Sequence, residues 1–151
     1  MGFGFPFGVG FALAKKIKKE EGKTFVLMSD GEMDCGTTWE SALITAHQKL
    51  DNLVVVVDAN GLQAMGEVKK ILNIDPLKDK WKAFGWDTQE IDGHNFEEIE
   101  KSFTASSEGK PKAIIARTIK GKGVSFMEGN NVYHYKAPSE EEYQKALEEL
   151  K

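Results

Sequence analysis

The strongest constraint on the fold is a pair of short apolar runs, each of which ends in polar residues. Residues 24–28 are Thr-Phe-Val-Leu-Met, and residues 53–57 are Leu-Val-Val-Val-Val. Unbroken apolar runs of this length are typical of strands that are buried on both faces of a parallel sheet. Ser-Asp-Gly-Glu follows the first run at 29–32, and Asp-Ala-Asn-Gly-Leu follows the second at 58–62. The pair therefore predicts a parallel sheet with polar groups at two strand ends.

The polar residues after these strands point to a binding site. Open α/β sheets bind ligands in the crevice outside the carboxyl ends of their strands. Asp30 and Asn60 stand at two such ends, and their side-chain oxygens suit a hard cation such as Mg²⁺. Gly31 lets the backbone approach a phosphate closely. Asp-Gly or Asn-Gly alone is more often an ordinary turn, so the combination carries the prediction.

The rest of the chain alternates between strand and helix patterns. Two more strands are predicted at 86–91 and 111–118. The predicted helices cover 6–19, 37–50, 75–84, 95–106 and a short segment after Ser139. This alternation predicts an α/β fold with a mostly parallel sheet and helices on both faces.

Three pairs of residues set the predicted helix starts. Asn95 with Glu98 and Ser139 with Glu142 match the capping-box pattern, and Asp75-Pro76 matches an N-cap followed by a first-turn proline. Between the last strand and the last helix lies a long glycine-rich stretch, 119–137. Loops of this length in a compact domain are often functional.

Length and composition exclude several classes of protein. A chain of 151 residues suits one domain. A net charge of −4 argues against a nucleic-acid binder. The apolar N-terminus is too short to span a bilayer, and its lysines follow the apolar run, which is the wrong order for a signal peptide. The N-terminus therefore predicts a soluble protein. Cys35 is the single cysteine, so no internal disulfide can form, and we expect a cytoplasmic protein.

Four segments then carry a family resemblance: 29–32, 36–40, 46–53 and 58–63. They resemble the thiamine-diphosphate motif of transketolases, which opens with Gly-Asp-Gly and closes with an Asn at the spacing that separates Asn60 from Asp30. The match resumes at 119–128 and 131–134, so it covers most of the chain from about residue 8. The chain is similar to the back part of the N-terminal subunit of a split transketolase. The resemblance implies that 1–151 form a single, partial domain with a truncated thiamine-diphosphate-binding fold.

The resemblance assigns a metal site. Asp30, Asn60 and the backbone carbonyl of Leu62 match the family's ligands for Mg²⁺ or Ca²⁺. In the family this metal bridges the two phosphates of thiamine diphosphate. A cation there offsets the cost of burying a diphosphate.

The resemblance also assigns the residues that contact the cofactor. Gly31 gives its backbone N–H to the diphosphate, and Glu32 belongs to the same cofactor-binding motif. His134 matches a family histidine that reaches both the diphosphate and the substrate, so it is the predicted catalytic residue. The chain departs from the family pattern at Cys35, where the family has Glu, and at Tyr135, where it has Gly.

Other residues have competing interpretations. His47 and Trp39 lie in a predicted helix and are more often structural than functional. His94 falls in a segment that resembles a structural loop near the mouth of the family's site. Lys120 could attract phosphate, but a solvated Gly-Lys loop is the more common case. Glu40 matches a family glutamate at a subunit contact.

The implied reaction is transfer of a two-carbon ketol unit between sugar phosphates, as in the pentose phosphate pathway. The resemblance implies a partner subunit with a pyrimidine-binding domain, whose glutamate activates the cofactor. We expect the isolated chain to be weakly active or inactive, and to form a homo-oligomer through Phe3, Phe5, Phe7 and Phe11. Two alternatives remain open: a non-catalytic half-domain with a role in folding or assembly, and an enzyme resembling 1-deoxyxylulose-5-phosphate synthase.

Overall fold

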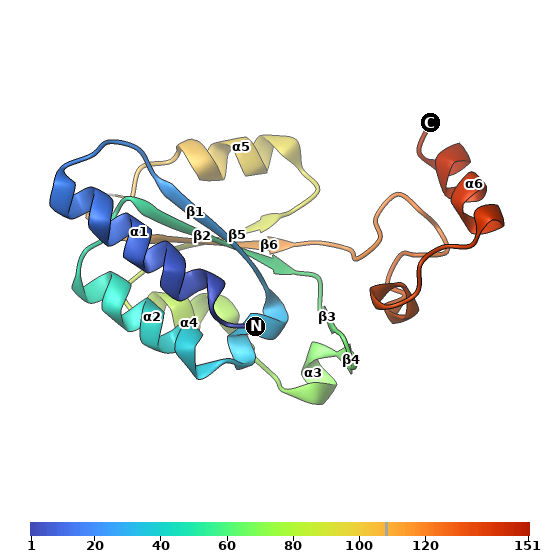
Figure 1. Cartoon of the computed structure of the whole chain (residues 1–151), viewed down its shortest axis with the longest axis horizontal. Coiled ribbons are helices and arrows are strands. Elements are labelled where there is room, and N and C mark those ends of the chain that lie inside the picture. Colours follow the sequence, from blue (N-terminus) through green and yellow to red (C-terminus); the bar gives the residue numbers. More distant parts are fainter. Residues whose placement is uncertain (108) are drawn as a thin grey trace.

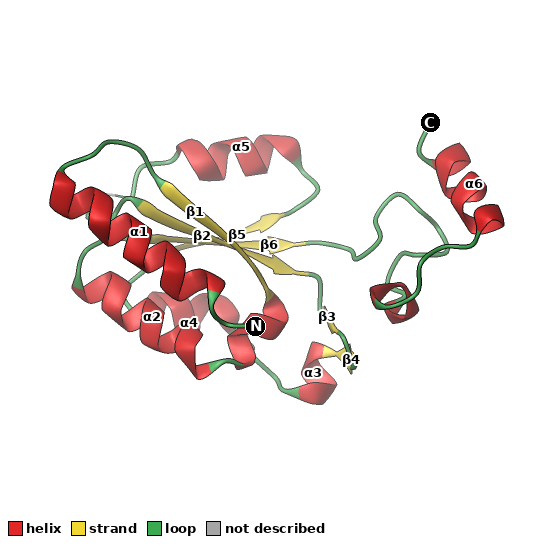
Figure 2. Ribbon diagram, in the orientation of Figure 1, coloured by secondary structure: helices red, strands yellow, loops and turns green. Residues whose placement is uncertain are grey.

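A four-stranded parallel sheet forms the centre of the molecule. The computed structural model describes residues 1–107 and 109–151. The strands are β1 (Thr24–Ser29), β2 (Leu53–Ala59), β5 (Asp87–Asp92) and β6 (Lys112–Arg117), in the order β1-β2-β6-β5 (Figure 2). Every neighbouring pair is parallel. The predicted α/β fold with a mostly parallel sheet is confirmed.

Burial along the strands follows their apolar content. The central strands β2 and β6 are buried on both faces, as the valine run and the segment Ala113–Ala116 predict. The edge strand β1 alternates, with Val26 and Met28 buried and Phe25 and Leu27 exposed. β5, the other edge, is polar along most of its length.

Helices cover both faces of the sheet, as predicted (Figure 1). On one face lie α1 (Gly4–Lys18), α2 (Gly36–His47) and α4 (Leu77–Ala83), and on the other lies α5 (Phe96–Thr104). The predicted helices are all present, with ends displaced by a few residues. Phe25 of β1 packs on Phe103 of α5, with ring centroids 5.6 Å apart.

Helix α1 lies close against β1 because it presents glycine there. A Cβ added at Gly8 would lie 2.3 Å from Val26 Cγ2, so no larger residue fits without displacement. Phe5 is fully buried, and its ring centroid lies 5.8 Å from those of Trp81 and Trp86. We expected all four N-terminal phenylalanines to be exposed for contact with another subunit, and this expectation is wrong for Phe5. Phe3, Phe7 and Phe11 remain 69, 67 and 67% exposed.

One of the three predicted helix starts is wrong, and a second lacks half of its predicted capping box. Pro76, rather than Asp75, is the N-cap residue of α4, and Asp75 instead forms ion pairs with Lys69 and Arg117. Asn95 does cap α5, but Glu98 accepts from the backbone N–H of Asp92 and not from that of Asn95.

The third predicted start is confirmed. In α6 (Glu140–Glu149), the Ser139 side chain accepts from the Glu142 backbone N–H, and the Glu142 carboxylate accepts from the Ser139 backbone N–H. These reciprocal bonds form the predicted capping box.

Several short elements were not predicted. A hairpin of β3 (Leu62–Gln63) and β4 (Gly66–Glu67) follows β2 and leads into α3 (Val68–Ile71). Two short 3₁₀ turns also form, η1 (Asp30–Asp34) and η2 (Asn131–His134).

After β6 the chain leaves the sheet and extends away from it, with α6 at the far end (Figure 1). We call residues 119–151 the arm and residues 1–118 the body. The arm has its own packing: the rings of Phe126 and Tyr133 lie 5.6 Å apart, and Glu149 accepts from the Ser125 hydroxyl at 2.8 Å. No helix in the described part of the chain is long and apolar enough to cross a membrane.

Candidate functional site

A cavity of about 490 Å³ opens at the carboxyl ends of β1 and β2. This is the location that the fold class predicts for a ligand. Five of the six predicted site residues line the cavity: Asp30, Gly31, Asn60, Leu62 and His134. The structure therefore brings together residues that lie more than a hundred positions apart in the sequence.

Asp30 is the most constrained of these residues. Its side chain follows β1 directly and is 2% exposed. Oδ2 accepts from the Gly61 backbone N–H at 2.8 Å, while Oδ1 is buried without a hydrogen-bond partner in the described part of the chain. Burial raises the pKa of Asp30, and the N–H groups of Gly61 and Gly31 partly oppose that rise. A buried, unpaired carboxylate oxygen suits a cation.

The turn after β2 joins the second strand end to Asp30. The Asn60 side-chain oxygen accepts from the Leu62 backbone N–H at 2.9 Å, and Gly61 adopts φ = 77°, which favours glycine. Because Gly61 also donates to Asp30, the two strand ends are held together. An amide oxygen has a second lone pair, so Asn60 retains the capacity to bind a cation.

Gly31 and Glu32 occupy different environments. Gly31 is buried at the cavity wall, where an added Cβ would reach contact distance of Met1 Cε at 3.4 Å and Gln63 Cγ at 3.5 Å. Glu32 does not line the cavity. Its carboxylate accepts from the Gly2 backbone N–H at 3.3 Å, and its carbonyl accepts from Thr38. Glu32 therefore tethers the N-terminal segment beside the site.

The arm contributes two basic residues to the cavity, His134 and Lys120. The amide of Asn131 donates to the carbonyl of Ala64 at 2.9 Å, which ties η2 to the β3–β4 hairpin and places His134 at the cavity wall. Lys120 was not predicted as a site residue. In the sequence it lies within the matched segment 119–128 and within a Gly-Lys loop, and such a loop usually indicates solvated residues.

Of the three remaining candidate residues, one lines the cavity and two do not. Cys35 lines the cavity as the N-cap residue of α2. His47 is exposed at the end of α2 and lies outside this cavity. Trp39 is structural, as expected, because its indole N–H donates to the Met33 carbonyl and its ring packs on Trp81 and Phe84.

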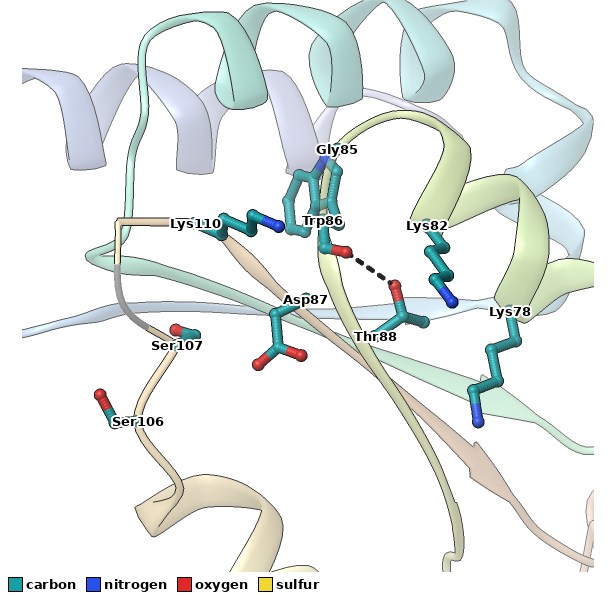
Figure 3. Close-up of a pocket in the computed structure, with 9 residues that line it drawn as sticks. All are labelled: Lys78, Lys82, Gly85, Trp86, Asp87, Thr88, Ser106, Ser107 and Lys110. Carbon is teal, nitrogen blue, oxygen red and sulfur yellow. Dashed lines mark hydrogen bonds between the residues drawn. The ribbon is translucent and has the colours of Figure 1, made fainter.

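A second cavity, of about 710 Å³, lies at the amino end of β5 (Figure 3). Lys78 and Lys82 of α4 and Lys110 contribute ammonium groups, and the Thr88 hydroxyl donates to the Trp86 carbonyl at 3.3 Å. This cavity contains none of the predicted site residues. It also lies at the opposite strand ends from those at which parallel sheets bind ligands.

Comparison with known proteins identifies the family. Residues 8–150 match the family described as "Transketolase, thiamine diphosphate binding domain". The chain belongs to this family. The resemblance found in the motifs at residues 29–63 and 119–134 is thereby confirmed.

Two transketolase-family relatives are similar along nearly the whole chain. One subunit of the apulose-4-phosphate transketolase of Phocaeicola vulgatus is 41% identical over 152 residues, which are 99% of this chain and 54% of that protein. The 6-deoxy-6-sulfo-D-fructose transketolase subunit SqwG of a Clostridium species is 40% identical, over 99% of this chain and 55% of that protein. The chain therefore spans about half the length of the curated relatives it matches.

The fold agrees with that of a solved transketolase. The crystal structure of transketolase from Campylobacter jejuni superposes with a TM-score of 0.92 at 32% identity, covering 99% of this chain and 25% of that one. Sheet order, helices and arm are thus those of a transketolase-family domain. Within the described residues, no three His, Cys, Asp or Glu side chains converge as a metal cluster, so a cation here would also need amide or backbone oxygens.

Proposed function

We propose that this chain is one subunit of a thiamine-diphosphate- and Mg²⁺-dependent transketolase that transfers a two-carbon ketol unit between sugar phosphates. The observation that carries the proposal is the buried, unpartnered Oδ1 of Asp30 at the cavity wall, within the described part of the chain. A carboxylate in this state gains most from a divalent cation, which removes the cost of its burial. Membership of the diphosphate-binding family supports the identity of the ligand.

The residues present fit a metal–diphosphate unit. Asp30 and Asn60 would supply side-chain oxygens to the cation, and Leu62 would supply its carbonyl. The Gly31 N–H and the Lys120 ammonium would bind diphosphate oxygens, because hydrogen-bond donors and positive charge stabilise a buried anion. Coordination by few protein groups is usual for Mg²⁺, which retains phosphate and water ligands.

The chain's own residues would bind and orient, while the cofactor supplies carbanion stabilisation. His134, at the cavity wall, would donate a hydrogen bond to a diphosphate oxygen or to a substrate hydroxyl. The substrates we propose are sugar phosphates or close analogues. The named activities of two relatives, on apulose-4-phosphate and on 6-deoxy-6-sulfo-D-fructose, support that class.

The proposal includes a partner. A pyrimidine-domain subunit would supply the glutamate that activates the cofactor, and the relatives' designation as subunits supports such an assembly. The exposed rings of Phe3, which precedes α1, and of Phe7 and Phe11 on α1 give an apolar surface for this partner or for a second copy.

The decisive experiment is calorimetric titration of thiamine diphosphate into the chain, with Mg²⁺ and with EDTA. We expect Mg²⁺-dependent binding that Asp30→Ala weakens by at least about tenfold, the effect of losing one charged ligand. Asp51→Ala, an exposed aspartate in the turn before β2, is the control and should bind as the wild type does. Equal affinity of Asp30→Ala and wild type would contradict the metal assignment.

Catalysis is tested by adding a pyrimidine-domain transketolase subunit to the chain and measuring ketol transfer. We expect turnover with the partner and little or none without it. Absence of both binding and turnover would favour the alternative of a non-catalytic half-domain.

A further inference from the structure

The junction between body and arm contains a histidine with a specific contact. His94, in the loop between β5 and α5, accepts a hydrogen bond at Nε2 from the backbone N–H of Ile119 at 2.8 Å. Ile119 is the first residue of the arm, and the next residue, Lys120, lines the cavity. The contact therefore lies one residue from the candidate site, although it joins segments that are distant in the sequence.

The position of His94 is fixed by its neighbours. Gly93 donates to the Arg117 carbonyl at 2.8 Å, and a Cβ at Gly93 would lie 2.4 Å from Thr118 Cγ2. The His94 backbone N–H also donates to Asp92 Oδ1 at 2.9 Å. The loop is thus pressed against the end of β6, where only glycine permits the approach.

The arm has few other attachments to the body. In the described part of the chain, two hydrogen bonds join them: Ile119 to His94 and Asn131 to Ala64. Just before the arm, the Thr118 hydroxyl donates to Asp58, which fixes the end of β6. Of these two bonds, the Ile119 contact is therefore the one that lies next to Lys120 in the sequence.

We propose that His94 is a positioning residue: its neutral imidazole, protonated at Nδ1 and free at Nε2, holds the start of the arm so that Lys120 faces the cavity. An imidazole nitrogen accepts a hydrogen bond only when it carries no proton, so the donor at Ile119 dictates this tautomer. The effect on ligand binding rests on the proposed function. The structural part, which is that His94 holds the start of the arm, is independent of the proposed function.

The structural part is tested on the ligand-free chain with three variants. A glutamine side chain can place its amide oxygen near the site of Nε2, so His94→Gln should keep the Ile119 contact, whereas His94→Leu removes it. Loss of one hydrogen bond corresponds to about 5- to 10-fold faster amide exchange at Ile119. Protection of η2 should stay unchanged, because Asn131 anchors it separately. His47→Leu, an exposed histidine outside the site, should match the wild type.

A second readout is the imidazole ¹⁵N chemical shift of His94, which reports the tautomer. We expect an unprotonated Nε2. A protonated Nε2, or unchanged Ile119 exchange in His94→Leu, would overturn the proposal.

The functional part is tested by thiamine diphosphate affinity with Mg²⁺ in His94→Leu, Lys120→Met and the double variant. If His94 acts through Lys120, each single change weakens binding several-fold and the double change adds little. Additive losses would overturn the positioning role. Failure of the wild type to bind even with the pyrimidine-domain subunit present would contradict the proposed function, while the exchange result would still decide whether His94 holds the arm.

Discussion

At the residue scale, Asp30 carries a cost of burial that a cation at the proposed metal site would remove. The side chain is 2% exposed, and one carboxylate oxygen has no partner in the described part of the chain. Burial is the largest cause of its raised pKa, and the nearby charges of Asp58 and Asp34 add to it. The folded chain therefore holds a proton at Asp30 more tightly than the unfolded chain does.

This difference in pKa between the folded and unfolded chain predicts that a neutral side chain at position 30 stabilises the folded state. The pKa of Asp30 is 3.8 in the ordinary case and higher in the folded chain. As the pH rises from 3.8 through the folded pKa, ionisation of Asp30 lowers the stability of the folded state, and this loss persists at neutral pH. In EDTA, Asp30→Asn should therefore unfold at a higher temperature than wild type at neutral pH, by about 2–4 °C for a gain of about 1 kcal/mol. Thermal unfolding followed by circular dichroism at several pH values measures this.

The gain should vanish below the ordinary pKa of the carboxyl, where both states are protonated. Asp51→Asn, an exposed change, should show no gain at any pH. A gain of equal size at every pH would mean that Asp30→Asn acts through packing and not through charge.

The cavity-lining residues at strand ends were predictable from the sequence, and those on the arm only in part. Asp30 and Asn60 follow apolar runs, so the strand pattern alone places them together. His134 needed the family resemblance. Lys120 was missed because its place at the cavity depends on contacts made by Ile119 and Asn131, which no local pattern encodes.

At the element scale, α6 is stabilised by its own N-terminus more than by the body. The Glu142 carboxylate accepts from Lys136, from the Ser139 backbone N–H and from the Tyr133 hydroxyl. These bonds lower the pKa of Glu142 to about 2, with the Lys136 bond the largest cause. One carboxylate thus links the helix to the segment that carries His134.

Acid should therefore loosen this end of the arm. Because the folded pKa lies below the ordinary 4.5, the contribution of Glu142 is complete above pH 4.5 and is lost as pH falls toward about 2. Glu142→Gln should shift the backbone NMR signals of α6 toward random-coil values already at neutral pH. Signals of the sheet should not move.

Glu141→Gln provides the matched control, since no hydrogen bond or ion pair involves its side chain in the described structure and it lies one position away. It should leave the α6 signals and their acid transition unchanged. Because glutamine can still accept from the Ser139 backbone N–H, an α6 that keeps its helical shifts in Glu142→Gln would show that the negative charge of Glu142 is dispensable.

Elements with strong apolar patterns were predicted within a few residues, while short polar ones were not. The hairpin β3–β4 lacks an Asn-Gly or Asp-Gly turn between its strands, so no turn signal marks it. In α1 the helical period separates Phe5 from Phe3, Phe7 and Phe11. The prediction from composition treated the four phenylalanines as one exposed cluster. The burial of Phe5 shows that helical periodicity predicts their exposure better.

At the scale of the whole molecule, the exposed face of α1 predicts association. Phe3, Phe7 and Phe11 recur at helical spacing, and each leaves about two-thirds of its surface in water. Burial contributes about 25 cal/mol per Å² of apolar surface, so covering the three rings yields several kcal/mol. The face therefore favours a second copy or a partner subunit.

Sedimentation velocity of wild type and of Phe7→Asp tests this. We expect the wild type to self-associate and the variant to sediment as a smaller species, because a buried carboxylate opposes the contact. Phe96→Asp is the matched control: Phe96 is 85% exposed on α5, on the other side of the sheet, and its loss should not change the assembly. A wild type that is strictly monomeric would contradict the prediction.

The distribution of aromatic residues gives this molecule two separate optical reporters. The three tryptophans, Trp39, Trp81 and Trp86, all lie in the body and pack against one another, whereas the three tyrosines, Tyr133, Tyr135 and Tyr143, all lie in the arm. Indole fluorescence therefore follows the core alone. Phenol emission follows the arm, and energy transfer from tyrosine to tryptophan rises whenever the arm moves toward the body, without any attached dye.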